Sequence, residues 1–341
     1  MTRAIGGFFP LESGLPQSPE SSYLDAWGVH RDHPAFHNLR GAFRFLLESL
    51  QPERVWLPDY ICSAMRDAVI AAGMKPGCYG INEQLSPDIE TLSGLLAPGD
   101  LCLAVDYFGR TPETDFLDYV SEHPEVVWVE DRAQAMLPGR SWGDYLLYSP
   151  RKLLGVPDGG LVTAGDTARP VELPAPELTR LDDLAFMDAS RHRLEDVAET
   201  DNATWYGEYL DAEASMAPGY HEISRLAWET LQKADAARHA RSRHTNFRTL
   251  YRHLGDLALL RDESPAYVPF GFPLVVEDAG ELSRRLAARR VFAPRYWPDM
   301  PGETETGAAR FLYEKVIMLP VDHRYGDEEM ERLAATVKML L

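Results

Sequence analysis

Apolar runs of strand length alternate with segments of helical spacing between residues 38 and 165, and this alternation constrains the fold most strongly. The runs are continuous, as in Leu101–Val105 (LCLAV), residues 126–129 (VVWV) and Tyr145–Tyr148 (YLLY). Continuous apolar strands are buried on both faces, and the helices between them provide the cover. The pattern therefore predicts an α/β domain with a mostly parallel sheet.

Helices are expected on either side of these strands. Residues 38–50 place apolar side chains at helical spacing, and residues 55–57 form a short strand that ends at Pro58. Residues 64–72 are expected to form the next helix, and Ser86-Pro87-Asp88 is a start signal for another toward Leu96.

The chain changes character after residue 177. Residues 177–222 carry 12 acidic and 3 basic residues, with little apolar order. Residues 225–252 are predicted to form one long helix of net charge +5, whose charges form a solvated face or pair with the acidic segment. Beyond residue 255, strand and helix signals return on a smaller scale. We expect a large domain over residues 1–225 and a smaller C-terminal α+β domain over 226–341.

Composition restricts the function. The chain has 34 Lys and Arg against 53 Asp and Glu, a formal net charge of −19. That balance argues against a nucleic-acid binder, which needs a basic face. The cysteines Cys62, Cys78 and Cys102 lack CxxC spacing, and no apolar stretch approaches the roughly 20 residues that span a bilayer. We expect a cytoplasmic protein that contacts neither nucleic acid nor membrane.

Several common motifs are missing from the sequence. It has no GxxxxGK[ST] loop and no GxGxxG after a strand, so it lacks the usual support for nucleotide hydrolysis or Rossmann-type hydride transfer. The histidines form no HExxH and the cysteines give no zinc spacing, so no metal site is predicted.

The block from residue 126 to 160 places polar groups just after two strands. Asp131 and Gln134 follow the first strand, and Ser149 and Lys152 follow the second. Ligands of open α/β sheets bind at the carboxyl ends of strands. A lysine for a Schiff base, a carboxylate for the pyridinium nitrogen and a hydroxyl for the phosphate are what a pyridoxal phosphate site needs. The alternative is an exposed lysine and a helix-capping aspartate. SPRK also matches SxxK of serine acyltransferases, but SDN and KTG are absent.

Six segments together resemble the DegT/StrS-type sugar aminotransferase family, which has the fold of type I pyridoxal phosphate enzymes (aspartate aminotransferase-like). The segments span nearly the whole chain: IGGFFPLE, FHNLRGAF, VWLPDYICSA, EDRAQA, SPRKLLGVPDGGLV and LPVDHRYGDEEMERL. The resemblance implies a large cofactor-binding domain, a smaller C-terminal domain, and a homodimer whose sites lie between the subunits.

The resemblance also implies site residues. Lys152 would form the internal aldimine and move the proton, Asp131 would pair with the pyridine nitrogen, and Gln134 would lie near the ring hydroxyl. The phosphate would be held by Ser149 and by the backbone of Arg40 and Gly41, at a helix N-terminus whose free N–H groups and dipole favour an anion.

This sequence departs from the family at four places. Cys62 stands where an aromatic ring usually stacks on the cofactor, and Tyr60 is the alternative stacking residue. Arg40 replaces a small or hydroxyl residue, and Ser149 stands closer to Lys152 than in many relatives. The asparagine that a partner subunit usually lends to the phosphate is not evident near residues 216–220.

The function predicted is transfer of an amino group from an amino acid to a keto substrate, with a nucleotide-linked keto-sugar as the candidate substrate. Two alternatives stay open: another carbanion reaction, such as a lyase, with the same cofactor, and a non-catalytic protein that binds it. Arg295, in FAPRYWP, is either a loop arginine stacked on Tyr296 or Trp297, or a clamp for a substrate carboxylate or phosphate.

Overall fold

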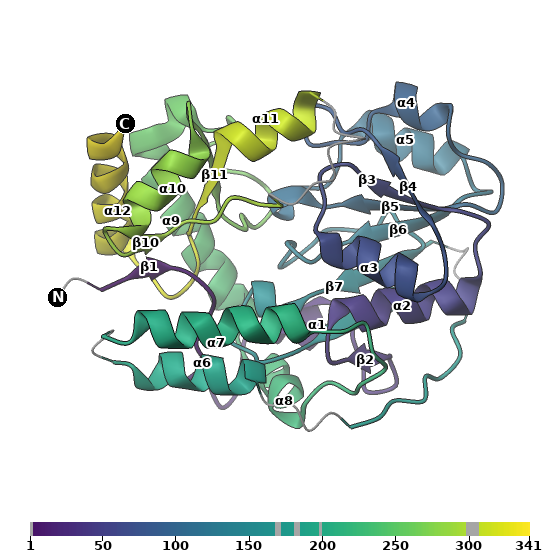
Figure 1. Cartoon of the computed structure of the whole chain (residues 1–341), viewed down its shortest axis with the longest axis horizontal. Coiled ribbons are helices and arrows are strands. Elements are labelled where there is room, and N and C mark those ends of the chain that lie inside the picture. The colour runs from purple at the N-terminus through teal and green to yellow at the C-terminus, as the bar shows by residue number, and fades with distance from the viewer. Residues whose placement is uncertain (1–2, 168–171, 181–184, 198–199, 298–306) are drawn as a thin grey trace.

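A seven-stranded sheet forms the centre of the computed structural model, which describes residues 3–167, 172–180, 185–197, 200–297 and 307–341 (Figure 1). Its spatial order is β2-β8-β7-β6-β5-β3-β4. The strands are β2 (Ala35–Phe36), β3 (Val55–Pro58), β4 (Pro76–Tyr79), β5 (Leu101–Val105), β6 (Val127–Asp131), β7 (Tyr145–Tyr148) and β8 (Gly160–Ala164).

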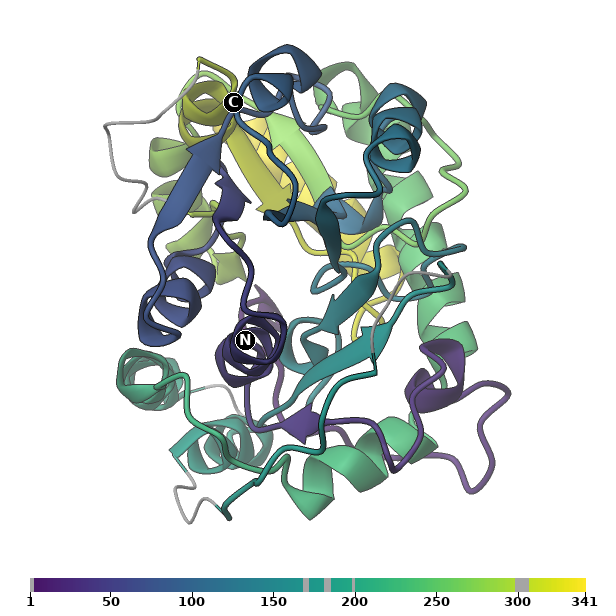
Figure 2. The same ribbon diagram turned by 90° about the vertical axis from the view of Figure 1, so that its right-hand side faces the viewer.

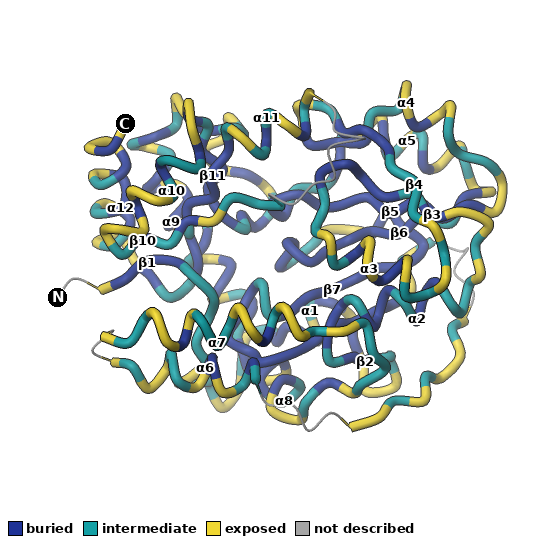
Figure 3. The backbone as a smooth tube through the Cα atoms, viewed as in Figure 1, coloured by how far each residue is buried: buried dark blue, intermediate teal, exposed yellow. Residues whose placement is uncertain are grey.

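The five strands from β7 to β4 run parallel, and only β8 and β2 run antiparallel to their neighbours. The prediction of an α/β fold with a mostly parallel sheet is confirmed. The middle strands β5 and β7 are buried along their whole length, which is why their sequences are continuous apolar runs (Figure 3). Strand β8 was not predicted, because its sequence, GLVTA, is short and begins with glycine.

The predicted helices of this part are confirmed with small shifts. They are α2 (Leu39–Leu50), α3 (Ser63–Ala71) and α4 (Ile89–Ser93), to which the structure adds α1 (Tyr23–Ala26), α5 (Thr114–Glu122) and the short 3-10 turns η1 (Tyr107–Gly109) and η2 (Pro150–Lys152). Helix α2 matters most for the site. The side chain of Asn38 caps it by accepting a hydrogen bond from the amide of Gly41 at 2.9 Å.

The acidic segment is more ordered than its composition indicates. It contains α6 (Ala185–Glu195) and α7 (Asn202–Ser215), which pack side by side as a helical hairpin (Figure 1). Few residues carry this packing, among them Phe186 and Trp205, and both are buried. The segment has little apolar order, as its sequence shows, but the few buried apolar residues are enough for two helices that cover each other.

The predicted helix over residues 225–252 is also corrected. It is two helices, α8 (Arg225–Lys233) and α9 (Ala236–Leu254). The break lies at Asp235, whose side chain accepts from the amide of Arg238 at 2.9 Å and so starts a new helix. The prediction that the basic residues form a solvated face is wrong for Arg243, which is buried. Arg243 donates to the carbonyl oxygens of Leu153 at 3.2 Å and Phe270 at 2.7 Å.

A smaller group of elements follows α9, which ends in the 3-10 turn η3 (Gly255–Leu257). It consists of β9 (Phe272–Val275) paired antiparallel with β11 (Val316–Leu319), the short strand β10 (Val291–Phe292), and the helices α10 (Ala279–Ala287), α11 (Gly307–Lys315) and α12 (Asp327–Leu340). Strands β9 and β11, coloured light green to yellow, lie behind the central sheet in Figure 2. The N-terminal strand β1 (Ile5–Gly6) pairs in parallel with β10. The N-terminal segment therefore packs against the C-terminal elements. The division at residues 225 and 226 stays a prediction. Among the helices that the structure describes, none is long and apolar enough to span a membrane.

Candidate active site

The predicted site residues lie where β3, β6 and β7 end, together with the first turn of α2. Asp131 is the last residue of β6 and is paired in register with Leu147 of β7. Ser149 follows β7 directly, and Lys152 ends the 3-10 turn that comes next. Because these parallel strands end at one edge of the sheet, side chains 21 residues apart in the sequence reach the same place.

Asp131 and Lys152 interact electrostatically. Burial raises the pKa of Asp131 above its ordinary value, and the ammonium group of Lys152 and a hydrogen bond from the amide of Ala133, at 2.9 Å, partly offset this effect. Lys152 is half-buried and Asp131 is 5% exposed. A carboxylate so placed gains from a second hydrogen-bond donor that carries positive charge.

Gln134 has one satisfied end and one unsatisfied end. Its Oε1 accepts from the amide of Phe108 at 2.7 Å, and its Nε2 is buried without a hydrogen-bond partner. Phe108 adopts a positive φ of 60° in the turn after β5. An unsatisfied buried N–H donor costs about 1–3 kcal/mol. The amide of Gln134 is thus oriented so that it can donate to an acceptor that the protein itself does not provide.

The start of α2 is pressed against the segment that follows Lys152. Gly159 forms a bridge with Asn38, and a Cβ on Gly160 would stand 2.2 Å from the Asn38 carbonyl carbon. Gly159 also has a φ of +132°, which side chains rarely adopt. The paired glycines therefore let the lysine loop and the helix start approach closely, which the sequence did not reveal.

A carboxylate from α7 lies between two arginines beside this helix start. Glu213 Oε1 lies 2.8 Å from Arg40 Nη2, and its Oε2 lies 3.2 Å from Arg151 Nη2. Burial opposes ionisation of Glu213, but Arg151, Arg40 and Lys152 outweigh it and lower its pKa. The guanidinium of Arg151 also stacks over the ring of Phe186 at 3.8 Å. We call Glu213, Arg40 and Arg151 the Glu213 cluster.

Sequence reasoning missed Glu213 and Arg151 as site residues. Arg151 stands next to Lys152, so its position was a usable signal. Glu213 lies 61 residues after Lys152, in a segment where the sequence analysis predicted no ligand. No local sequence pattern marks it. The segment after it also covers the helix start, because Asn38 Nδ2 donates to the Ala217 carbonyl at 3.0 Å and Arg44 Nη1 to the Pro218 carbonyl at 3.2 Å.

Tyr60 and Cys62 both follow β3. Tyr60 is buried, with its ring centroid 4.7 Å from that of Trp297 in an edge-to-face contact. Cys62 is half-buried at the N-terminus of α3 and does not cap the helix with its side chain. Tyr60 thus contacts the C-terminal elements, and which of the two stacks on a cofactor stays a prediction.

Two buried acidic residues, Asp106 and Glu130, lie beside Arg132 in the loop after β6. Arg132 Nε donates to Glu130 Oε1 at 2.5 Å, and Glu130 Oε2 accepts from the amide of Trp142 at 3.0 Å. Burial, followed by the charge of Glu130, raises the pKa of Asp106 well above its ordinary value. These contacts hold Glu130 and Arg132, the two chain neighbours of Asp131, and so position the loop that carries Gln134.

Arg295 adopts neither of the stackings expected for it. Its guanidinium lies over the ring of Tyr313 on α11, 5.2 Å from the centroid. A role as an anion clamp stays a prediction. A cavity of about 1040 Å³ opens elsewhere, beside β2 and α8, and is lined by residues including Arg31, His37 and Asp158 but not by Lys152.

The comparisons with known proteins concern the fold. No family model and no curated protein matches the sequence. Solved structures do match, with full probability. The PLP-form of Spr1654 from Streptococcus pneumoniae is 15% identical, covers 98% of each chain and has a TM-score of 0.69. The chain has the same fold as these solved aminotransferases. A DegT DnrJ EryC1 StrS aminotransferase from Brucella abortus is 16% identical, over 90% of this chain and 85% of its own, with a TM-score of 0.59. DesI in the presence of its TDP-sugar product is 16% identical, over 93% and 82%, with a TM-score of 0.66. The structural neighbours are thus the type of aminotransferase that the sequence motifs resemble.

Proposed function

We propose that the protein is a pyridoxal phosphate-dependent aminotransferase. It takes an amino group from an amino acid and transfers it to a keto substrate, with a nucleotide-linked keto-sugar as the proposed acceptor. The observation that carries the proposal is the placement of Lys152 and Asp131 together at the edge of the sheet, in a fold shared with aminotransferases. The acceptor class is supported by the likeness to DesI.

The residues present fit this cofactor at its ring end. The unsatisfied Nε2 of Gln134 offers a hydrogen bond to a ring hydroxyl oxygen, and the buried carboxylate of Asp131 offers a partner for a ring N–H. At the other end, Ser149, Arg40 and the first turn of α2 would hold the phosphate. Bound there, the cofactor would supply an electron sink for carbanion chemistry and carry the amino group between substrates.

The roles of the protein residues follow from their chemistry. Lys152 Nζ would attach the cofactor and then hold or return the proton at the reacting carbon. Asp131, as a carboxylate, would keep the ring nitrogen protonated. Its buried position strengthens that interaction because the local dielectric is low. The family resemblance implies a homodimer. Light scattering of the purified protein tests this by measuring its molar mass in solution.

The experiment reconstitutes the purified protein with pyridoxal phosphate. We expect a visible absorption band that Lys152→Ala abolishes and that Lys75→Ala retains. Addition of an amino acid donor should then convert the bound cofactor to its amine form, detected by mass spectrometry. Absence of the band in the wild type refutes cofactor binding. A band without conversion by any amino acid favours a lyase or a non-catalytic binder over an aminotransferase.

A further inference from the structure

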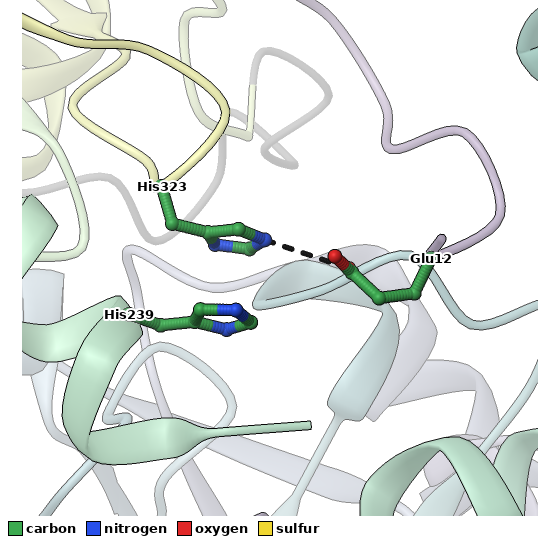
Figure 4. Close-up of side chains that lie close together, drawn as sticks. All are labelled: Glu12, His239 and His323. Carbon is green, nitrogen blue, oxygen red and sulfur yellow. Dashed lines mark ion pairs between the residues drawn. The ribbon is translucent and has the colours of Figure 1, made fainter. Parts of the chain in front are cut away.

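Two histidines and a glutamate from three distant parts of the chain meet behind the lysine loop. They are Glu12 of the N-terminal segment, His239 of α9 and His323 of the loop between β11 and α12 (Figure 4). One ligand atom from each lies within 4.8 Å of the others. His239 is 8% exposed, and the side chains of His323 and Glu12 are 8% and 15% exposed. We call these three residues the Glu12 cluster.

The ring of His323 is sandwiched but unsatisfied. It stacks on His239 with a centroid distance of 3.5 Å and an angle of 2°, and on Phe9 with 5.6 Å and 13°. Both of its ring nitrogens are buried without a hydrogen-bond partner, although Nε2 is 3.4 Å from Glu12 Oε2. Buried polar atoms are almost always satisfied. The nitrogens of His323 are therefore open to a ligand at this place.

The donor types fit a divalent transition metal. The cluster offers two imidazole rings and one carboxylate, all on side chains that are at most 15% exposed. Neutral imidazole and carboxylate are the ligands that zinc takes in sites with three protein ligands.

A hydrogen bond with Tyr23 supports His239 as a ligand. Its Nδ1 lies 2.9 Å from Tyr23 Oη. When Nδ1 donates to this oxygen, Nε2 carries the lone pair, which is the arrangement that metal-binding histidines use. In the stacked arrangement the lone pairs point in parallel. Binding of one ion by the Nε2 atoms of both rings therefore requires the His323 ring to turn out of this stack.

We propose that the Glu12 cluster binds one zinc ion, with the fourth position open to water. The charges facing the cluster are Arg243 and Asp235 at His239 and Asp322 and Arg324 beside His323; the last two neutralise each other as an ion pair of 2.7 Å. The ion would join the N-terminal segment to α9 and the β11–α12 loop. It would also reach the lysine loop, because Glu12 Oε2 accepts from the Gly155 amide at 3.0 Å.

The test measures zinc in the full chain without pyridoxal phosphate, so that its result does not depend on the proposed function. Protein stripped with a chelator is dialysed against Zn²⁺ and analysed by elemental mass spectrometry. We expect about one zinc per chain in the wild type, with a higher unfolding temperature than the stripped protein. His323→Gln and His239→Gln should lose most of the metal. Less than a tenth of a zinc in the wild type overturns the proposal.

Two further variants separate this site from others. His253→Ala removes a surface histidine that pairs with Glu331 at 2.6 Å, and it should retain the zinc. Glu12→Gln keeps the shape and the acceptor for Gly155 but removes the charge, so it should weaken zinc binding at least tenfold while the protein still folds. Equal zinc binding by wild type, Glu12→Gln and His323→Gln assigns the metal to other residues and refutes the proposal.

Discussion

The Glu213 cluster gives a prediction about the cofactor phosphate. In the structure the carboxylate of Glu213 uses the guanidinium groups of Arg40 and Arg151 that stand beside the proposed phosphate position. An incoming phosphate must share or replace that carboxylate. We therefore expect Glu213→Gln to bind pyridoxal phosphate more tightly than the wild type, because the variant keeps the side-chain shape but removes the competing charge.

The magnitude follows from the geometry. A fully buried charge-assisted hydrogen bond contributes about 1.5–3 kcal/mol, but exposed pairs contribute only about 0–1 kcal/mol. The side chain of Glu213 is 35% exposed, so about 0.5–1 kcal/mol for each of its two arginine contacts is reasonable. Together they correspond to about 1–2 kcal/mol, or a dissociation constant lowered by about 5- to 30-fold.

The assay is a titration of purified apo protein, followed by visible absorbance. Pyridoxal, which lacks the phosphate, serves as the internal control, and its affinity should change less than about twofold because the ring end is untouched. Glu208→Gln is the matched variant. It removes the same charge from the same helix but contacts His192, 3.1 Å away, instead of the arginines. The affinity of Glu208→Gln for pyridoxal phosphate should equal that of the wild type.

Two results would refute this reasoning. Weaker binding of pyridoxal phosphate by Glu213→Gln means that Glu213 positions the arginines for the phosphate and does not compete with it. An equal gain for pyridoxal and pyridoxal phosphate means that the effect comes from movement of α7 and not from charge. Either result removes Glu213 as a competitor at the phosphate position.

Two further predictions concern stability. Gly160→Ala places a Cβ 2.2 Å from the Asn38 backbone, so it should lower the free energy of unfolding by about 3 kcal/mol or more, whereas Gly139→Ala, with nothing within 4 Å, should change it by less than about 1 kcal/mol in urea titrations. Burial raises the pKa of Asp158 to about 6, against hydrogen bonds with Ser224. The contribution of Asp158 to the free energy of unfolding should therefore fall by about 2 kcal/mol as pH rises from 4 to 6, measured as the difference between the pH profiles of the wild type and Asp158→Asn; identical pH profiles would contradict this.

Much of the sheet, and the meeting of Asp131 and Lys152 in the candidate site, could be predicted from the sequence. Continuous apolar runs such as Leu101–Val105 require burial on both faces, and this requirement alone places helices around a parallel sheet. Parallel strands end at one edge, so the residues just after two of them, Asp131 and Lys152, had to lie close together. The break at Asp235 was missed because a capping side chain and a surface aspartate look alike in a basic helical segment.

The sequence by itself thus determined the class of the fold and which residues stand at the strand ends, because both depend on local periodicity. Only the tertiary structure decided what meets them. Glu213 reaches Arg40 across 173 residues, and Glu12 reaches His323 across 311, through packing of segments that carry no matching local pattern. Such contacts depend on how helices and loops dock on one another, and neither residue spacing nor charge along the chain encodes that arrangement in a readable form.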